Sequence, residues 1–274
     1  KIIKTDNNFR DANINWKQTQ ENVSNIIKPI LENKTVVTQG FIGSNIDGNT
    51  TTLGREGSDY TAAVFANMLD AESQTIWKDV ENVMNADPRE VRDAIALPEL
   101  NYTEVIEMAY YGAQVIHPKT IKPLQNKSIP LYVKCFLNAS LPGTVIHNQS
   151  VKNLPPIIVL KKNQVMMELK SKDFSFIGEQ NTGVLYGMFE QLSIKPNLTQ
   201  NGAINMICVF DNRADKIKQL AAKASEIFDV QITVGLSLLT IRHYTEESIK
   251  RFTEGKNVLV TQQTKQNATW LFEM

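Results

Sequence analysis

The chain has 274 residues, 42% of them hydrophobic and 21% charged, and a formal net charge of zero. This length and apolar content suffice for one large or two smaller domains with real cores. The even charge balance argues against nucleic-acid or anionic-membrane binding. No apolar run approaches the roughly 18 residues of a membrane span, so we expect a cytoplasmic protein without membrane or nucleic-acid partners.

The first half alternates predicted helices with short apolar strands. In chain order we expect a helix at 16–31, a strand at 34–43, a helical segment at 62–69, a strand at 72–77, a helix at 102–112 and a strand at 129–134. Such alternation predicts a layered α/β domain, whose ligands bind at the carboxyl ends of the strands.

Residues 51–63 (TTLGREGSDYTAA) form the most informative stretch. Glycines bracket a loop that presents Arg55, Ser58 and Asp59 at the expected start of a helix. A guanidinium can clamp a carboxylate and a carboxylate can hold an ammonium, so the pattern suits a zwitterionic ligand. The helix start adds backbone N–H groups and a partial positive charge. A capped helix with a surface ion pair explains the same spacing.

After residues 154–156 the pattern changes. We expect strands at 157–160 and 165–170, a helix at 182–192, a strand pair at 196–210 with a turn at Asn201-Gly202, a helix at 214–228, a strand at 237–243, a helix at 246–252 and strands at 257–261 and 268–272. This β-α-β-β-α-β order, partly repeated, predicts ferredoxin-like ligand-sensing modules.

Cysteines and histidines give little sign of metal or redox chemistry. Cys135 and Cys208 lie far apart in apolar runs, which fits buried thiols of a reducing compartment better than a disulfide framework. The three histidines have no ligand-spaced partners, so no metal site is expected. His117, which precedes Pro118, is interpreted as a structural turn rather than as an acid–base group.

Four collinear segments, residues 50–63, 77–89, 102–120 and 129–146, resemble aspartate kinase of the amino-acid kinase superfamily. The resemblance implies the distal part of an amino-acid kinase α/β/α sandwich in residues 1–150. It implies a first ACT regulatory domain in residues 151–236 and a second, partial or interleaved, in residues 237–274. The implied reaction transfers the γ-phosphoryl group of Mg-ATP to the side-chain carboxylate of aspartate, in the first step of lysine, threonine and methionine biosynthesis. No tightly bound cofactor is implied.

The resemblance also implies site residues. Arg55 would hold the α-carboxylate of aspartate, Ser58 and Asp59 would orient the amino acid, and Phe41 would form a wall of the pocket. The implied nucleotide contacts are Lys78, Asp79, Met84, Arg89, Gln114 and Val115. The implied effector contacts are Ser175, Phe176, Ile177, Gly178, Pro196, Asn197, Asn201 and Gly202. A hairpin and a helix cap without any ligand would explain the second set equally. Lysine or threonine is the implied effector, and a homodimer is expected because ACT domains pair across chains.

Several positions depart from the family pattern. Glu56 replaces a common Gly, Gln114 a common Lys, Lys78 a common Thr and Met84 a frequent Tyr. The Glu56 side chain would crowd the loop or add negative charge near the phosphates. Asn197 stands where some lysine-sensitive members have Asp, so the identity of the effector stays open.

The chain begins at Lys1 and reads like the middle of a domain, so we expect an N-terminally truncated protein. The family's N-terminal Lys-Phe-Gly-Gly-Thr-Ser type loop, which supplies a lysine for the phosphates, has no counterpart in it. We therefore expect little or no kinase activity from this polypeptide, although its parent would be active. The alternative is a noncatalytic amino-acid-binding regulatory subunit of an aspartate kinase. Fusion to homoserine dehydrogenase would require a downstream G-x-G-x-x-G unit, which this sequence does not contain.

Overall fold

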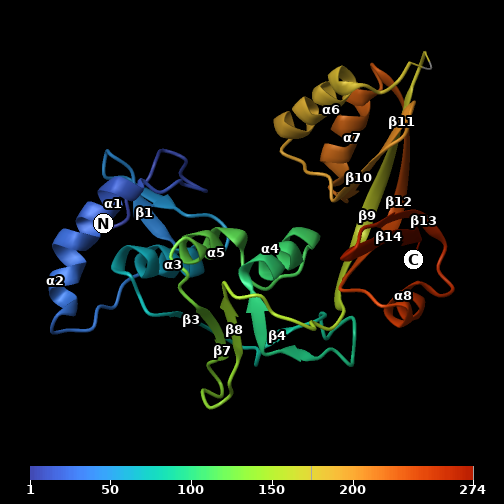
Figure 1. The fold of residues 1–274 in the computed structure, drawn as a ribbon. Coiled ribbons are helices and arrows are strands. Elements are labelled where there is room, and N and C mark those ends of the chain that lie inside the picture. Colours follow the sequence, from blue (N-terminus) through green and yellow to red (C-terminus); the bar gives the residue numbers. More distant parts are fainter. Residues whose placement is uncertain (174, 274) are drawn as a thin grey trace. The chain divides into compact units, whose positions relative to one another are not determined.

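The chain folds around separate sheets that belong to two units, Lys1–Leu154 and Pro155–Met274 (Figure 1). The computed structural model describes residues 1–173 and 175–273. The predicted boundary after residue 150 falls just before the division between the units.

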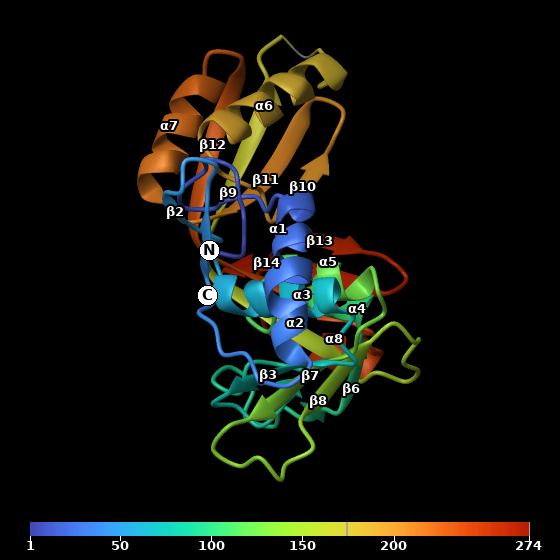
Figure 2. The ribbon, with the colours of Figure 1, turned by 90° about the vertical axis from the view of Figure 1, so that its left-hand side faces the viewer.

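A four-stranded mixed sheet in the order β3-β7-β8-β6 organises the first unit. β3 (Gln74–Lys78) runs parallel to β7 (Leu131–Cys135), and β6 (Glu99–Asn101) runs parallel to β8 (Thr144–His147). The helices α3 (Gly57–Leu69), α4 (Tyr102–Tyr111) and α5 (Pro118–Gln125) lie on one side of this sheet in both views (Figures 1 and 2). Strand side chains alternate between faces, and Ile76, Leu131 and Val133 are buried.

The N-terminal segment packs against α3. The predicted helix at 16–31 is present as α1 (Trp16–Asn22), a π-helical turn η1 (Val23–Ile27) and α2 (Lys28–Leu31). Its buried side chains share a core with Leu53, which precedes the Arg55 loop, and with Val64 and Met68 of α3. That core consists of Ile3, Ile14, Val23, Ile27, Leu53, Val64 and Met68. This core therefore holds α3 and the residue Leu53 before it in place.

The predicted strand at 34–43 is wrong for most of its length. Only β1 (Ile42–Ser44) forms there, pairing with β2 (Thr50–Thr52), while residues 35–40 have no regular structure. Val37 is 94% exposed, so its apolar character marks no buried strand. Two further short strands, β4 (Val83–Met84) and β5 (Ala96–Leu97), form a separate ribbon.

The second unit is one six-stranded antiparallel sheet in the order β10-β11-β9-β12-β14-β13. Its elements are β9 (Ile157–Ser171), α6 (Glu179–Gln191), β10 (Leu198–Asn201), β11 (Asn205–Asp211), α7 (Ala214–Ala224), β12 (Phe228–Arg242), α8 (Glu246–Thr253), β13 (Val258–Gln263) and β14 (Asn267–Glu273). The helices α6 and α7 cover a core that includes Met167, Leu185, Phe189, Phe210 and Phe228.

Two ferredoxin-like halves share the long strands β9 and β12. Residues 164–171 of β9 pair with 228–236 of β12 in the first half, and residues 157–161 pair with 238–242 in the second. The predicted boundary between residues 236 and 237 therefore lies inside a continuous strand. Gly235, with φ of 77°, lies where the register of β12 shifts between the halves.

Three other boundaries differ from the sequence-based prediction. The predicted strands at 157–160 and 165–170 are one strand, because the polar residues 161–163 continue β9. The predicted helix at 214–228 ends at Ala224, and Phe228 is instead buried at the start of β12. In the first residues of β12, apolar and polar side chains alternate, so this part of the sequence has no continuous apolar run that would predict a strand.

Both cysteines are free and buried, as predicted, and burial raises the pKa of Cys208 to about 12. Within residues 1–173 and 175–273, no helix has the length and apolar character to cross a membrane.

Candidate functional site

The loop before α3 has an unusual backbone. Gly54 has φ of +80°, and a Cβ there would lie 2.2 Å from Asp11 Oδ1, so the turn requires glycine. Glu56 follows with φ of 52° and immediately precedes α3. Its side chain makes no capping hydrogen bond. Within the described part of the chain, no side chain accepts a hydrogen bond from the backbone N–H groups of Ser58 and Asp59.

Phe41 lies against this loop. Its backbone N–H donates to Thr61 Oγ1 at 3.0 Å, and its carbonyl accepts from the Leu53 N–H at 2.9 Å. A Cβ on Gly57 would meet the Phe41 ring at 2.6 Å, so the first residue of α3 must be small. The structure thus brings Phe41 to the start of α3, where the sequence predicted a pocket wall.

Arg55 and Asp59 do not neutralise each other. Arg55 is exposed, and among the described residues its guanidinium has no hydrogen-bond or ion-pair partner. The Asp59 carboxylate lies 3.8 Å from Lys78 Nζ, with 23% of its side chain exposed. Burial raises the pKa of Asp59, and the nearby Lys78 ammonium opposes that shift. The surface ion pair considered as the alternative for this spacing is therefore wrong.

Lys78 links this loop to the segment after α4. At the carboxyl end of β3, its Nζ donates to the Val115 carbonyl at 3.0 Å. Gln114 is exposed beside Val115, and Asp79 is exposed after Lys78. Four of the predicted nucleotide residues thus lie at or next to one contact, and through Lys78 this contact reaches Asp59.

Met84 and Arg89 are not part of this group. Met84 belongs to β4 and pairs with Ala96 of β5. Arg89 is 83% exposed and forms an ion pair at 2.7 Å with Asp87, two residues earlier. The hydrogen bonds and ion pairs recorded for the two residues stay within this region and do not reach Lys78 or Val115.

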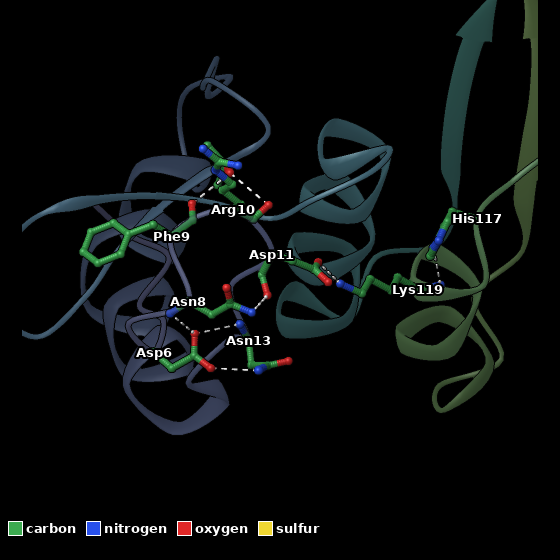
Figure 3. Close-up of polar contacts among 9 residues, drawn as sticks. Asp6, Asn8, Phe9, Arg10, Asp11, Asn13, His117 and Lys119 are labelled. Carbon is green, nitrogen blue, oxygen red and sulfur yellow. Dashed lines mark hydrogen bonds and ion pairs between the residues drawn. The ribbon is translucent and has the colours of Figure 1, made fainter. Parts of the chain in front are cut away.

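Polar contacts that the sequence analysis missed surround the same loop. Lys119 forms an ion pair with Asp11, which packs on Gly54 (Figure 3). Their separation of 108 residues leaves no local signal in the sequence. His117 caps α5, because its Nδ1 accepts from the Lys119 N–H at 3.2 Å. Burial lowers the pKa of His117. This geometry matches the structural turn predicted for it.

The second unit contains an open hollow with a volume of ≈ 550 Å³ beside α6. It is lined by Ile177, Gly178, Thr182, Gly183, Tyr186 and Asn201. Three of the predicted effector residues, Ile177, Gly178 and Asn201, therefore lie together. A hydrogen bond of 2.9 Å from the Ile177 N–H to the Ala203 carbonyl holds the two sides in place.

The other predicted effector residues do not line this hollow. Ser175 donates to the Asp173 carboxylate at 2.6 Å, Phe176 is 79% exposed, and Gly202 turns the chain after β10. Pro196 and Asn197 lie at the opposite end of β10.

Asn197 is already occupied by the protein itself. Its Oδ1 accepts from Lys161 Nζ at 2.8 Å, and its Nδ2 donates to Gln164 Oε1 and Asp211 Oδ1, each at 2.8 Å. Gln164 is buried and also donates to Asp211. We call Lys161, Gln164, Asn197 and Asp211 the Asn197 cluster.

Comparisons with known proteins show which family the chain resembles. Residues 5–135 match the model of the amino acid kinase family. The chain is 31% identical, over 88% of its length, to lysine-sensitive aspartokinase 3 of Escherichia coli (strain K12), and it covers 55% of that relative. The chain thus spans about half the length of this curated relative.

Two crystal structures of E. coli aspartokinase III resemble the fold. The complex with aspartate and ADP (R-state) matches with a TM-score of 0.82 and 28% identity, covering 100% of this chain and 65% of that chain. The complex with lysine and aspartate (T-state) matches with a TM-score of 0.79 and 28% identity, covering 99% and 64%. Residues 5–135 therefore match the amino acid kinase family, and the chain is similar in sequence and fold to aspartokinases over most of its length.

Proposed function

We propose that this chain acts in an aspartate kinase, which transfers the γ-phosphoryl group of Mg-ATP to the side-chain carboxylate of L-aspartate. The observation that carries the proposal is the pair Arg55 and Asp59. Among the residues that the structure describes, the guanidinium has no partner, and it and the carboxylate flank the start of α3 without neutralising each other. Such a pair complements the carboxylate and the ammonium of an amino acid. The E. coli relative was crystallised with aspartate and ADP, which supports this choice of ligands.

In this proposal each side chain has one role. Arg55 binds the α-carboxylate, Asp59 and Ser58 hold the ammonium group, and Phe41 forms the pocket wall. The acceptor carboxylate then lies toward Lys78, whose ammonium offsets negative charge between acceptor and nucleotide. Phosphoryl transfer demands alignment and charge compensation more than covalent participation, and these residues would align the aspartate for it.

The predicted nucleotide contacts fall into two groups. Lys78, Asp79, Gln114 and Val115 lie at one edge, and we propose that the phosphates of Mg-ATP bind there. Met84 and Arg89 are proposed as nucleotide contacts on the resemblance alone.

We also propose that an amino acid, lysine before threonine, binds the hollow beside α6 and regulates the enzyme through paired ACT domains of a homodimer. The name of the E. coli relative and its complex with lysine support lysine. Asn201 offers the hollow an amide, and Tyr186 adds an aromatic wall.

Calorimetry tests the aspartate site directly. Aspartate should bind the wild-type chain, and Arg55→Ala should weaken binding about 10- to 100-fold, because a hydrogen bond to a charged group contributes roughly 1.5–3 kcal/mol. Arg92→Ala, which removes another exposed arginine, is the control. Succinate lacks the ammonium group and should bind more weakly than aspartate. Trapping of the acyl phosphate with hydroxylamine in the presence of Mg-ATP then tests transfer itself, and this polypeptide should give little or no trapped product.

Two outcomes would contradict the proposal. Equal loss of affinity in Arg55→Ala and Arg92→Ala would show that Arg55 has no specific role. Binding of lysine without binding of aspartate or ADP would favour the noncatalytic regulatory subunit instead.

A further inference from the structure

Glu56 combines a strained backbone with a specific contact. Its φ of 52° is left-handed, a conformation that costs free energy for any residue other than glycine. Its carboxylate Oε2 accepts a hydrogen bond of 2.7 Å from the backbone N–H of His117. Strain of this kind persists only where surrounding interactions over-determine it, and it gathers at functional sites. The contact to His117 is one such interaction.

This hydrogen bond joins two parts of the proposed active site. Glu56 lies between Arg55 and the first turn of α3, and His117 begins α5 immediately after the segment that carries Val115. Lys78 makes a second link in the same place, because its Nζ contacts both the Val115 carbonyl and Asp59. The 115–117 segment is therefore held to the start of α3 through one carbonyl and one N–H group.

The same contact also directs the negative charge of Glu56. A negative side chain at a helix N-terminus is attracted to the first-turn N–H groups and to the positive end of the helix dipole. Here the carboxylate is bound by His117 and makes no cap, so the N–H groups beside Ser58 stay accessible to a ligand anion. Without that hydrogen bond, the carboxylate would be able to swing toward Arg55 or the helix start and compete with a bound carboxylate.

We propose that Glu56 is a positioning residue that couples aspartate binding to nucleotide binding. This inference rests on the proposed function, since it takes the Arg55 loop as the aspartate site and the segment around Val115 as the nucleotide site. When aspartate orders the loop, the Glu56 hydrogen bond holds the 115–117 segment in register with it. Each ligand then binds more tightly in the presence of the other, because coupling between two sites is reciprocal.

Double titration by calorimetry measures this coupling. The dissociation constant of ADP with Mg²⁺ is determined with and without saturating aspartate, and that of aspartate with and without ADP. For the wild type we expect each ligand to tighten the other several-fold. Glu56→Gly removes the hydrogen bond and also the backbone strain, so it should fold, yet the tightening should shrink toward onefold. Glu56→Gln keeps an acceptor oxygen and should retain most of it.

Asp70→Ala is the matched control. Asp70 is also acidic and left-handed, with φ of 54°, and it lies at the other end of the same helix, paired with Lys127. Its removal should leave the coupling unchanged.

Amide exchange of His117, followed by nuclear magnetic resonance, reads the hydrogen bond without any ligand. Exchange should be about tenfold or more faster in Glu56→Gly and within a few-fold of wild type in Glu56→Gln. Unchanged exchange in Glu56→Gly overturns the link. Normal binding of both ligands with undiminished coupling in Glu56→Gly overturns the coupling role alone. Wild-type protein that binds neither ligand overturns the proposed function and the coupling with it.

Discussion

Asp59 and Asp211 are two carboxylates beside lysine ammonium groups, but their surroundings are built differently. Among the described residues, Asp59 forms an ion pair with Lys78 alone, at 3.8 Å, and its pKa is raised by burial and, to a smaller extent, by the nearby Glu56 carboxylate. Asp211 also pays a burial cost, yet its hydrogen bonds from Gln164 and Asn197 and the charge of Lys161 leave its pKa below the ordinary value. The first carboxylate has capacity for a further cationic partner, whereas the second already has its donors.

The cations show the same contrast. Arg55 is exposed and unpaired among the described residues, while Lys161 is half-buried and donates to Asn197. Similar residue types thus form an open cluster around α3 and a closed one around Asn197. An open cluster presents unsatisfied charge to a ligand, and a closed one satisfies itself and contributes to the fold.

The two ends of β10 show the same contrast, because Asn201 at one end lines the hollow and Asn197 at the other belongs to the closed Asn197 cluster. The substitution with the largest expected effect tests the hollow. Gly183→Leu places a side chain in the hollow, because a Cβ at Gly183 meets nothing within 4 Å. We expect lysine or threonine binding, measured by calorimetry, to fall at least about 100-fold, or out of the measurable range, since an amino acid and a leucine side chain cannot share the hollow.

Gly187→Leu is the matched control for that experiment. Gly187 lies on the same helix, also faces open space and does not line the hollow. Both substitutions should stabilise α6 by up to about 1 kcal/mol through helix propensity, so a difference in binding cannot come from the fold. Unchanged affinity in Gly183→Leu would show that the effector binds elsewhere.

A substitution in the Asn197 cluster should lower the stability of the second unit rather than the affinity for the effector. Asn197→Ala removes the acceptor of Lys161 and a donor to Asp211, leaving polar groups unsatisfied beside the buried Gln164. We expect a loss of about 2 kcal/mol in stability, within the range of 1–3 kcal/mol for such deletions. Native-state hydrogen exchange of the β9 and β11 amides measures this for the second unit by itself.

Effector affinity in Asn197→Ala should stay within about twofold of wild type. A large loss of affinity with unchanged amide protection would instead make Asn197 an effector ligand, as the resemblance implied.

The sequence predicted elements better than it predicted partners. Local periodicity and the Gly-bracketed loop placed α3, α4 and α8, because each has its own helical pattern and boundary signals. Residues 34–43 predicted a strand that forms only from Ile42 onward, because burial depends on contacts with distant segments. The sharing of β9 and β12 between two halves had no local signal, because each half of a long strand resembles an ordinary short one.

The candidate site divides in the same way. Arg55, Ser58 and Asp59 stand out because they lie in one motif, and Phe41 was implied by the resemblance; the structure places Phe41 against the start of α3, where the other three lie. The Asp11–Lys119 pair and the Glu56–His117 hydrogen bond join residues far apart in sequence, so no single-sequence pattern announces them. The resemblance implied both Asn197 and Asn201 as effector contacts, but a strand between them carries the two side chains to opposite ends.

The smallest expected effect is the pH dependence of folding stability, to which Asp59 and Asp211 should contribute with opposite signs. The folded pKa of Asp59 lies above its unfolded value, so the folded state binds that proton more tightly. Its contribution favours folding at low pH and is lost as pH rises through the raised pKa. The folded pKa of Asp211 is depressed, so its contribution is present above the unfolded pKa and is lost as pH falls through the folded one.

Asparagine substitutions isolate these contributions. At pH 7, Asp59→Asn should stabilise the first unit and Asp211→Asn should destabilise the second, each by no more than about 1 kcal/mol because both carboxylates remain partly solvated. Amide protection within each unit, compared at pH 7 and near pH 4, measures the two effects, and both differences should shrink at the lower pH. If Asp59→Asn stabilises the first unit and also weakens aspartate binding, then the proposed aspartate site retains this carboxylate at a cost in folding stability. Destabilisation by both substitutions would place Asp59 among the closed contacts and remove the distinction between the two clusters.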